Sequence, residues 1–299
     1  KNILSKVYKY YMKILAVQNR KGVGDTVIFL PFIKALSKKF NSPISILVKE
    51  NSKADQYLHQ TNYIDKILIL ERDDKTNNKH GGFFGIFNLA NDLKKHKFDK
   101  IFIFNSSLRF NLIAKMSGIP KIYQYPLFTK TKQHIIEVPK KFLKTNLDLY
   151  VNEDPEIQIN NDLVFKATQK FQINKKEINI LLGIGGSGTT KRIPAKIFLS
   201  VIDKISSIKS CKFFLATGKA YEEQEILNEI LRSKFKNFCI RLDNLPIGEI
   251  LPLIKNCNVS ICNDSSFSHL SSALGVNTIT LMADTPLIYG NYSTKMYPI

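Results

Sequence analysis

The feature that most constrains the fold is an alternation of short β-rich runs with longer stretches of helical period, and the chain passes through it twice. Strand-like runs in the first half lie at residues 13–18, 44–48, 67–70 and 101–104, with a helical stretch at 26–40. The second half has strand-like runs at 178–184, 212–216, 238–240, 259–261 and 278–281, with helical segments at 195–208, 222–233 and 247–255. Such an alternation builds parallel sheets with helices on their faces. We therefore predict an α/β protein with two doubly wound, Rossmann-like domains.

The length of the chain and one polar segment predict where these domains meet. At 299 residues the chain exceeds the usual size of a single compact core. Residues 151–156 are polar and turn-rich and contain a proline, as a domain boundary does. We predict domains at 1–155 and 156–299. Another polar stretch, at 73–82, is predicted to be a long surface loop.

A formal net charge of +19 bears on binding partners more than on the fold. The basic residues are spread along the chain without a nucleic-acid-binding motif, so we expect no nucleic acid partner. Two explanations stay open: peripheral contact with an acidic membrane surface, and a lysine-rich but ordinary solvated surface. No apolar run approaches the roughly 20 residues of a membrane-spanning helix, and the start of the chain lacks a secretory signal. We expect a cytoplasmic protein that contacts, at most, the inner face of the cytoplasmic membrane.

Two loops, one in each half, follow strand-like runs and open helix-like stretches. Main-chain N–H groups at such junctions point outward, and this edge of an open α/β sheet is where ligands bind. In the first loop, at 22–25, two glycines let the backbone approach a ligand. Asp25 is either the N-cap of the next helix or a functional carboxylate, and the motif alone favours the cap.

The loop in the second half, at 263–269, offers several hydrogen-bond donors to a phosphate. Asp264 can cap the following helix, and His269 lies one turn into that helix on the same face. The hydroxyl donors are those of Ser265 and Ser266.

A third loop, at 183–194, combines glycines, hydroxyl groups and a basic pair. Its glycines expose N–H donors, and Lys191 supplies a positive charge, which together suit a phosphate or diphosphate. The hydroxyl groups are those of Ser187, Thr189 and Thr190. A merely flexible loop would not need the adjacent basic pair, so binding is favoured.

Acidic residues follow the strand-like run at 212–216. Glu222 and Glu223 can accept hydrogen bonds from a ribose, or they can complement the dipole of the helix that they open. The sequence does not separate these two roles.

Taken together, these residues resemble glycosyltransferase family 9, the lipopolysaccharide heptosyltransferases. Four stretches carry the resemblance in order along nearly the whole chain: residues 22–31, 107–118, 185–194 and 263–275. The resemblance implies a GT-B architecture, in which two Rossmann-like domains face an interdomain cleft. It also implies inverting, metal-independent transfer from a nucleotide-activated sugar, typically ADP-heptose, to a lipopolysaccharide core or related glycan acceptor.

The resemblance further implies roles for particular residues. Asp25 resembles the general base that takes a proton from the acceptor hydroxyl, and Lys191 the cation that serves in place of a metal at the leaving diphosphate. Asp264 is expected to hold donor sugar hydroxyls, and Glu222 the ribose. Further donor-binding candidates are Ser187, Thr189, Thr190, Ser265, Ser266 and His269. Arg20, Lys21 and Arg109 are acceptor-binding candidates for the phosphates or carboxylates of an anionic glycolipid.

No Asp-x-Asp motif is present, so we expect no metal and no cofactor beyond the nucleotide-sugar substrate, and we expect a monomer. Two other function classes stay open. A nucleotide-binding protein of similar fold without transfer activity is expected if Asp25 only caps its helix. A basic adaptor at a membrane or nucleic acid would bind polyanions without recognising a sugar nucleotide.

Overall fold

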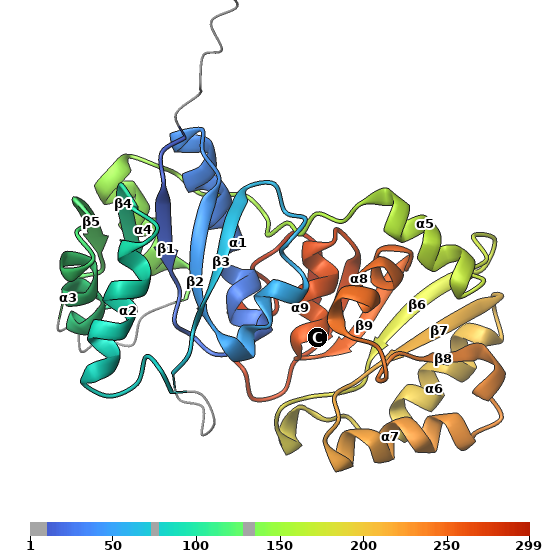
Figure 1. Cartoon of the computed structure of the whole chain (residues 1–299). Coiled ribbons are helices and arrows are strands. Elements are labelled where there is room, and N and C mark those ends of the chain that lie inside the picture. Colours follow the sequence, from blue (N-terminus) through green and yellow to red (C-terminus); the bar gives the residue numbers. More distant parts are fainter. Residues whose placement is uncertain (1–10, 73–77, 128–134) are drawn as a thin grey trace, which may run out of the picture. The chain divides into compact units, whose positions relative to one another are not determined.

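The computed structural model describes residues 11–72, 78–127 and 135–299, which form two α/β units (Figure 1). Of the described residues, the first unit comprises 11–21 and 32–50 and those within 62–151. The second comprises residues 22–31, 51–61 and 152–299. Helix α1 (Val23–Phe40) is therefore shared, because its first turns belong to the second unit and the remainder to the first.

The first unit is built on a parallel sheet with the strand order β3-β2-β1-β4-β5. Its strands are β1 (Ile14–Val17), β2 (Ile44–Lys49), β3 (Ile64–Leu70), β4 (Lys100–Ile103) and β5 (Lys121–Gln124). Val17 at the end of β1 lies opposite Leu47 and Ile103, so the carboxyl ends of the central strands share one edge. Strands β1 and β4 are buried at every position, as apolar runs covered on both faces should be.

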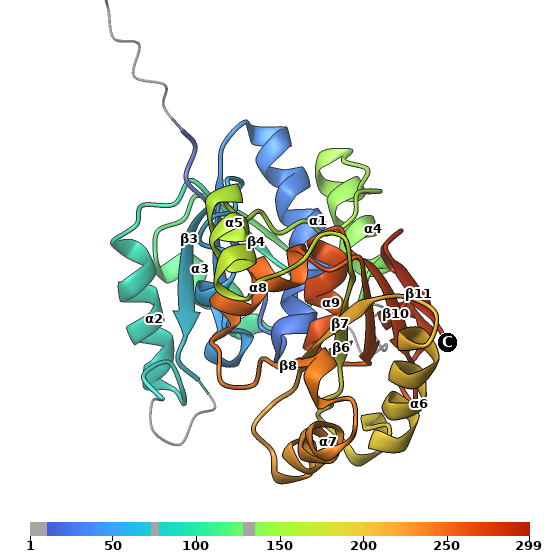
Figure 2. The ribbon, with the colours of Figure 1, turned by 90° about the vertical axis from the view of Figure 1, so that its right-hand side faces the viewer.

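The helices of the first unit follow its strands along the chain. Besides α1 they are α2 (Phe84–Lys94), α3 (Leu108–Met116) and α4 (Glu137–Leu147). A 3₁₀ turn at Glu50–Ser52 lies where the chain passes from the first unit to the second, and the turn at Ala54–Gln56 belongs to the second. Helices α2 and α3 lie side by side (Figures 1 and 2) and bury Leu89 and Phe110 in one core with Val17 and Ile103. This packing of helices on strands stabilises the sheet by removing apolar surface from water.

The second unit has its own parallel sheet, with the strand order β11-β10-β9-β6-β7-β8. Its strands are β6 (Ile178–Gly183), β7 (Cys211–Ala216), β8 (Cys239–Arg241), β9 (Val259–Asn263), β10 (Asn277–Leu281) and β11 (Met296–Pro298). Gly183 at the end of β6 lies opposite Ala216 of β7 and Cys262 of β9. The strand order reverses direction between β6 and β9, which makes their shared edge the topological switch point of this sheet.

The helices of the second unit cover both faces of its sheet. They are α5 (Asn161–Lys170), α6 (Ala195–Ser206), α7 (Tyr221–Arg232), α8 (Ile247–Lys255) and α9 (Ser266–Ala273), with 3₁₀ turns at Thr189–Lys191, Lys236–Phe238 and Leu287–Tyr289. Helices α6 and α7 pack together on one face, whereas α5 and α8 pack together on the other (Figure 2). Helix α9 follows β9 directly and is buried from Phe267 to its end.

The predicted fold class is confirmed, since both halves are parallel-sheet α/β units. The pattern did not predict β5 or β11, which are short. Of the loop predicted at 73–82, residues 73–77 lie outside the described part of the chain. Residues 78–82 form turns, but His80 is buried against Asp92 instead of lying at the surface.

Candidate functional site

Three loops of the second unit meet at the carboxyl ends of adjacent strands β7, β6 and β9. They are the glycine-rich loop after Gly183, the turn at Thr217 and Gly218, and the loop from Asn263 into α9. Asn263 links two of them, because its side-chain amide donates to the carbonyl of Ile184 at 2.9 Å. The predicted donor-binding residues on these loops are therefore gathered at the switch-point edge of one sheet.

Lys191 and Asp264, 73 residues apart in the sequence, form an ion pair at this edge. The ammonium donates to Asp264 Oδ2 at 2.6 Å, and the Asp264 side chain is 4% exposed. Burial by itself raises the pKa of Asp264, but hydrogen bonds from Lys191 and Thr285 and the charge of Lys191 outweigh it, so the pKa is lowered. Lys191, the predicted phosphate-binding cation, and Asp264, the predicted sugar-binding carboxylate, thus pair with each other.

Of the two glutamates that the sequence could not tell apart, Glu223 is the buried one. It accepts hydrogen bonds from the main-chain N–H of Gly186 at 2.7 Å and of Ala220 at 3.3 Å. A Cβ added to Gly185 would lie 2.4 Å from its carboxylate, so glycine is required where the loop passes over it. Glu223 therefore fixes the glycine-rich loop to the start of α7.

Glu222, the candidate for the ribose, points elsewhere. Its side chain is 63% exposed and pairs with Arg192 at 3.3 Å. An ion pair with one exposed partner contributes little to stability, so Glu222 can leave Arg192 and bind a ligand hydroxyl at a low cost in free energy.

Buried hydroxyl groups without a partner lie at the same edge. Among the described residues, Thr217 Oγ1 and Ser265 Oγ are buried and accept or donate no hydrogen bond. Most buried polar groups in proteins are hydrogen-bonded, so exceptions beside a strand-end loop mark places where a ligand can bind. Sequence reasoning missed Thr217, although its position directly after β7 was a usable signal.

The other hydroxyl-bearing candidates differ in exposure. Ser187, Thr189 and Thr190 are all exposed to solvent, and Thr190 Oγ1 donates to Asp284 at 3.1 Å. Ser266 is half-buried in the first turn of α9. Asp284, which holds Thr190, is a second residue that the sequence did not point to.

His269 is buried and uncharged at neutral pH. Its Nδ1 lies 2.8 Å from the hydroxyl of Tyr292, and the two rings stack with their centroids 5.6 Å apart. Burial lowers the pKa of His269 to about 4. The helix N-terminus and Lys191 are thus better placed than His269 to meet a negative charge.

The loop of the first motif also reaches His269 within the second unit. Gly22 has a φ of 95°, a left-handed conformation that favours glycine just before α1. A Cβ added to Gly24 would lie 2.6 Å from His269 Cδ2, so the second glycine permits close approach of the helix backbone to the ring. Asp25 follows in the first turn of α1 and is half-buried.

The acceptor-binding candidates lie in the first unit. Arg20 and Lys21 follow β1, with Lys21 exposed, and Arg109 is in the first turn of α3. The guanidinium of Arg109 donates to the main-chain oxygens of Gly82 at 2.7 Å and His80 at 2.6 Å. Arg109 therefore has a structural role that the sequence did not predict, and its contact with an acceptor stays a prediction.

Two buried carboxamides lie at the carboxyl ends of neighbouring strands in the first unit. Gln18 follows β1 and accepts from the N–H of Arg20 at 3.1 Å, while Asn105 follows β4 and accepts from the N–H of Ser107 at 3.0 Å. Because an N–H can only donate, these bonds identify the side-chain oxygen of each carboxamide as the acceptor and leave its NH₂ group for another partner. Both NH₂ groups are buried and without a partner among the described residues. They are hydrogen-bond donors that the sequence analysis did not identify.

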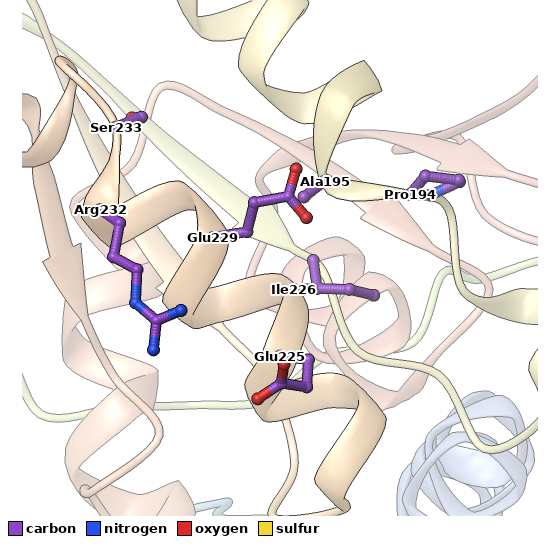
Figure 3. Close-up of a pocket in the computed structure, with 7 residues that line it drawn as sticks. All are labelled: Pro194, Ala195, Glu225, Ile226, Glu229, Arg232 and Ser233. Carbon is purple, nitrogen blue, oxygen red and sulfur yellow. The ribbon is translucent and has the colours of Figure 1, made fainter.

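A surface pocket of about 500 Å³ opens between α6 and α7 (Figure 3). Glu225, Glu229 and Arg232 line it from α7, and Glu229 points toward Ala195 at the start of α6. None of the predicted site residues lines it, and its two carboxylates would repel a diphosphate. The pocket is distinct from the strand-end site.

The described ranges 11–72, 78–127 and 135–299 contain no candidate metal centre. No three His, Cys, Asp or Glu side chains there lie close enough together to hold a metal ion. Metal-independent chemistry stays a prediction, because a metal can also arrive bound to the diphosphate of a substrate. In the same ranges, no helix is long and apolar enough to cross a membrane.

Comparisons of the sequence and of the structure with known proteins both find members of one glycosyltransferase family. The profile of glycosyltransferase family 9 (heptosyltransferase) matches residues 86–295. Lipopolysaccharide heptosyltransferase 1 of Campylobacter coli is 29% identical over 96% of this chain and 89% of its own length. Two solved structures share the fold. A family 9 glycosyl transferase from Veillonella parvula has a TM-score of 0.77 and 20% identity, and the match covers 97% of this chain and 87% of that chain. The ADP-heptose lipopolysaccharide heptosyltransferase II of E. coli has a TM-score of 0.73 and 16% identity, and the match covers 96% of this chain and 90% of that chain.

Proposed function

Because the chain belongs to glycosyltransferase family 9 (heptosyltransferase), we propose that it transfers a heptose from ADP-heptose to the core of a lipopolysaccharide. The enzyme class and the link to lipopolysaccharide biosynthesis follow from the family and its heptosyltransferase relatives. The donor is proposed because the E. coli protein of the same fold is an ADP-heptose heptosyltransferase. The observation that carries the proposal is the Lys191–Asp264 pair at the switch-point edge, beside hydroxyl groups without partners.

We propose that the donor diphosphate binds where the glycine-rich loop meets the start of α9. Lys191 has three N–H donors and gives one to Asp264, so the others can reach phosphate oxygens. Main-chain N–H groups in the first turn of α9 and the hydroxyls of Thr217 and Ser265 complete a set of donors. These groups stabilise the negative charge that grows on the diphosphate as it leaves.

The reaction proposed is a single displacement at the anomeric carbon of the donor sugar. An acceptor hydroxyl oxygen attacks that carbon while the bond to the diphosphate oxygen breaks, and the electron pair leaves with the nucleoside diphosphate. Asp25 takes the proton of the attacking hydroxyl, a contribution of typically about 10²–10⁴-fold for a positioned base. Attack opposite the leaving group inverts the anomeric configuration, and no metal is proposed in any step.

The acceptor is proposed to be an anionic glycolipid bound by the first unit. Arg20 and Lys21 supply charge, and the NH₂ groups of Gln18 and Asn105 supply fixed donors at neighbouring strand ends. Positively charged side chains and N–H donors together can bind the carboxylate or phosphate oxygens of an acidic sugar.

The test is a transfer assay with purified protein, heptose-deficient lipopolysaccharide core and ADP-, UDP- or GDP-activated sugars, each with EDTA or with added magnesium. We expect the mass of the acceptor to increase by one heptose with the ADP donor, and EDTA to leave the rate within about twofold. Nucleotide binding without any sugar transfer would instead support a nucleotide-binding protein of the same fold. A strict requirement for a metal would contradict the proposed role of Lys191.

A further inference from the structure

Three phenylalanines at the start of α2 are exposed although their rings contact one another. Phe83 and Phe84 are 69% and 78% exposed, and Phe87 is 42% exposed. The ring of Phe83 lies 6.0 Å from that of Phe84 and 5.5 Å from that of Phe87, centroid to centroid. Single exposed apolar side chains are normal, but a contiguous aromatic cluster is not.

Helix α3 extends this cluster with a stripe of its own. Leu108, Leu112 and Met116 are exposed and follow one another at intervals of four residues, which places them along one face of the helix. The start of α3 is tied to the start of α2, because Arg109 donates to the carbonyl of Gly82. We call these exposed side chains the α2–α3 apolar patch: Phe83, Phe84, Phe87, Leu108, Leu112 and Met116.

The core of the first unit does not account for the patch. Both helices already bury a different face in that core, α2 with Leu89 and Leu93 and α3 with Phe110 and Ile113. A helix with a second apolar face, exposed to water, has that face available for a partner.

The charge around the patch indicates the chemistry of that partner. Residues 79–121 carry eight Lys or Arg and two Asp, a formal charge of +6. Lys94 and Lys115 are exposed and follow Phe87 and Leu108 by seven residues, which places them on the same helix faces as the patch. Lys95 and Lys97 are exposed just after α2. Aromatic side chains bordered by lysines are typical of surfaces that bind anionic membranes.

A second copy of the chain fits this surface less well. A two-fold symmetric contact would bring the patch and its +6 segment against the same segment of the partner, and the like charges would repel. An anionic bilayer meets both the apolar and the basic parts of the surface.

We propose that the α2–α3 apolar patch docks the protein on an anionic lipid bilayer. The phenylalanine rings enter the boundary between headgroups and acyl chains, and the flanking lysines contact lipid phosphates. The interaction requires neither the sugar donor nor transfer activity, so it can be tested apart from the proposed function.

The test is co-sedimentation of the purified 299-residue chain with vesicles of phosphatidylcholine alone or of phosphatidylcholine and phosphatidylglycerol in a ratio of about three to one. Binding is expected with the anionic vesicles and is expected to weaken as salt is added. The triple variant Phe83→Ser/Phe84→Ser/Phe87→Ser should lower the partition coefficient at least about tenfold. Its melting temperature should stay close to that of the wild type, because the mutated side chains lie outside the core.

The matched control removes three exposed apolar side chains that are scattered over the surface. Tyr150→Ser/Phe165→Ser/Ile208→Ser should bind anionic vesicles within about twofold of the wild type. If the patch triple variant melts early, Phe84→Ser alone replaces it. Equal loss in both triple variants, or no loss in the patch variant, would overturn the proposal. A patch variant that loses self-association in sedimentation velocity but keeps vesicle binding would assign the surface to a second copy.

Discussion

At the scale of single residues, the candidate site is governed by pairs whose partners are far apart in the sequence. Lys191 neutralises a carboxylate that is almost fully buried, and Glu223 holds the N–H of Gly186 from a different loop. His269 is buried as a neutral ring on Tyr292. These pairs fix the loops before a ligand arrives, which lowers the ordering cost of binding.

Separating the two roles of Lys191 requires a change at Asp264 as well. Lys191→Met leaves a buried carboxylate without its partner and should destabilise the protein by about 1–3 kcal/mol. Lys191→Met/Asp264→Asn should recover most of that stability, since an amide needs no counter-charge. Both variants should bind ADP about ten- to a hundredfold more weakly than wild type, with little change for adenosine.

Chemical denaturation measures the stabilities, and calorimetric titration with ADP and with adenosine measures the affinities. Full recovery of ADP affinity in the double variant would show that Lys191 serves only to neutralise Asp264.

The pKa of His269 predicts a dependence of stability on pH. Its folded-state pKa of about 4 lies below the ordinary 6.5, so the unfolded state binds more protons between these values. The contribution of His269 is therefore complete above about pH 6.5 and is lost as the pH falls towards about 4. The loss is on the order of 3 kcal/mol.

Unfolding free energies measured from pH 7 to 4.5 test this for wild type and His269→Gln. The variant should show a clearly smaller slope over this range. Equal slopes in the two proteins would mean that other groups cause the dependence.

At the scale of elements, parallel strands bring the loops of the site together, and the buried Glu223 joins two of them by hydrogen bonds. Adjacent strands β7, β6 and β9 end in register, so the loops after Ala216, Gly183 and Asn263 meet without long connections. Glu223 at the start of α7 then joins its own helix to the glycine-rich loop. The site is thus a product of strand order, as in other open α/β sheets.

Neighbouring glutamates provide a matched comparison at this scale. Glu223→Ala leaves the buried N–H of Gly186 without its acceptor, so we expect a loss of about 1–3 kcal/mol of stability. Glu222→Ala should change stability by less than about 0.5 kcal/mol, because the Glu222 side chain is 63% exposed. If Glu222 holds the ribose, its loss should weaken adenosine and ADP equally. Thermal unfolding measures the stabilities of the two variants, and calorimetry measures their affinities for adenosine and ADP. If Glu222→Ala lost more stability than Glu223→Ala, the structural role assigned to Glu223 would be wrong.

Periodicity predicted the central strands and helices α1, α6, α7 and α8, but it did not predict α2, α4 or α5, and side-chain pairing needed the fold. The strands that form the centres of both sheets are apolar runs, which is why the two α/β units could be predicted. Strand β5 is largely half-exposed and β11 has three residues, so neither gives a clear pattern. The Lys191–Asp264 pair depends on β9 lying beside β6, which residue order alone does not specify. The sequence also could not show which of Glu222 and Glu223 is buried. Successive side chains on a helix point about 100° apart, so this depends on how the helix is oriented in the fold.

At the scale of the whole molecule, the chemistry is divided between two units of similar architecture. The second holds the strand-end site with Lys191 and Asp264, and the first holds Arg20, Lys21 and the two carboxamides whose buried NH₂ groups lack a partner among the described residues. A net charge of +19 suits both a nucleotide-sugar donor and an anionic glycolipid. Transfer is proposed to depend on Asp25, which opens the helix shared by the two units.

The most direct test of the proposed transfer is to compare wild type and Asp25→Asn with ADP-heptose and a heptose-deficient lipopolysaccharide acceptor, measuring turnover and donor affinity separately. An amide keeps the shape of the side chain but accepts a proton poorly, so we predict turnover at least about a hundredfold lower. Donor affinity by calorimetry should stay within about threefold of wild type. Near-normal turnover in Asp25→Asn would contradict the role of Asp25 as the base and leave it as a carboxylate that only stabilises the first turn of its helix.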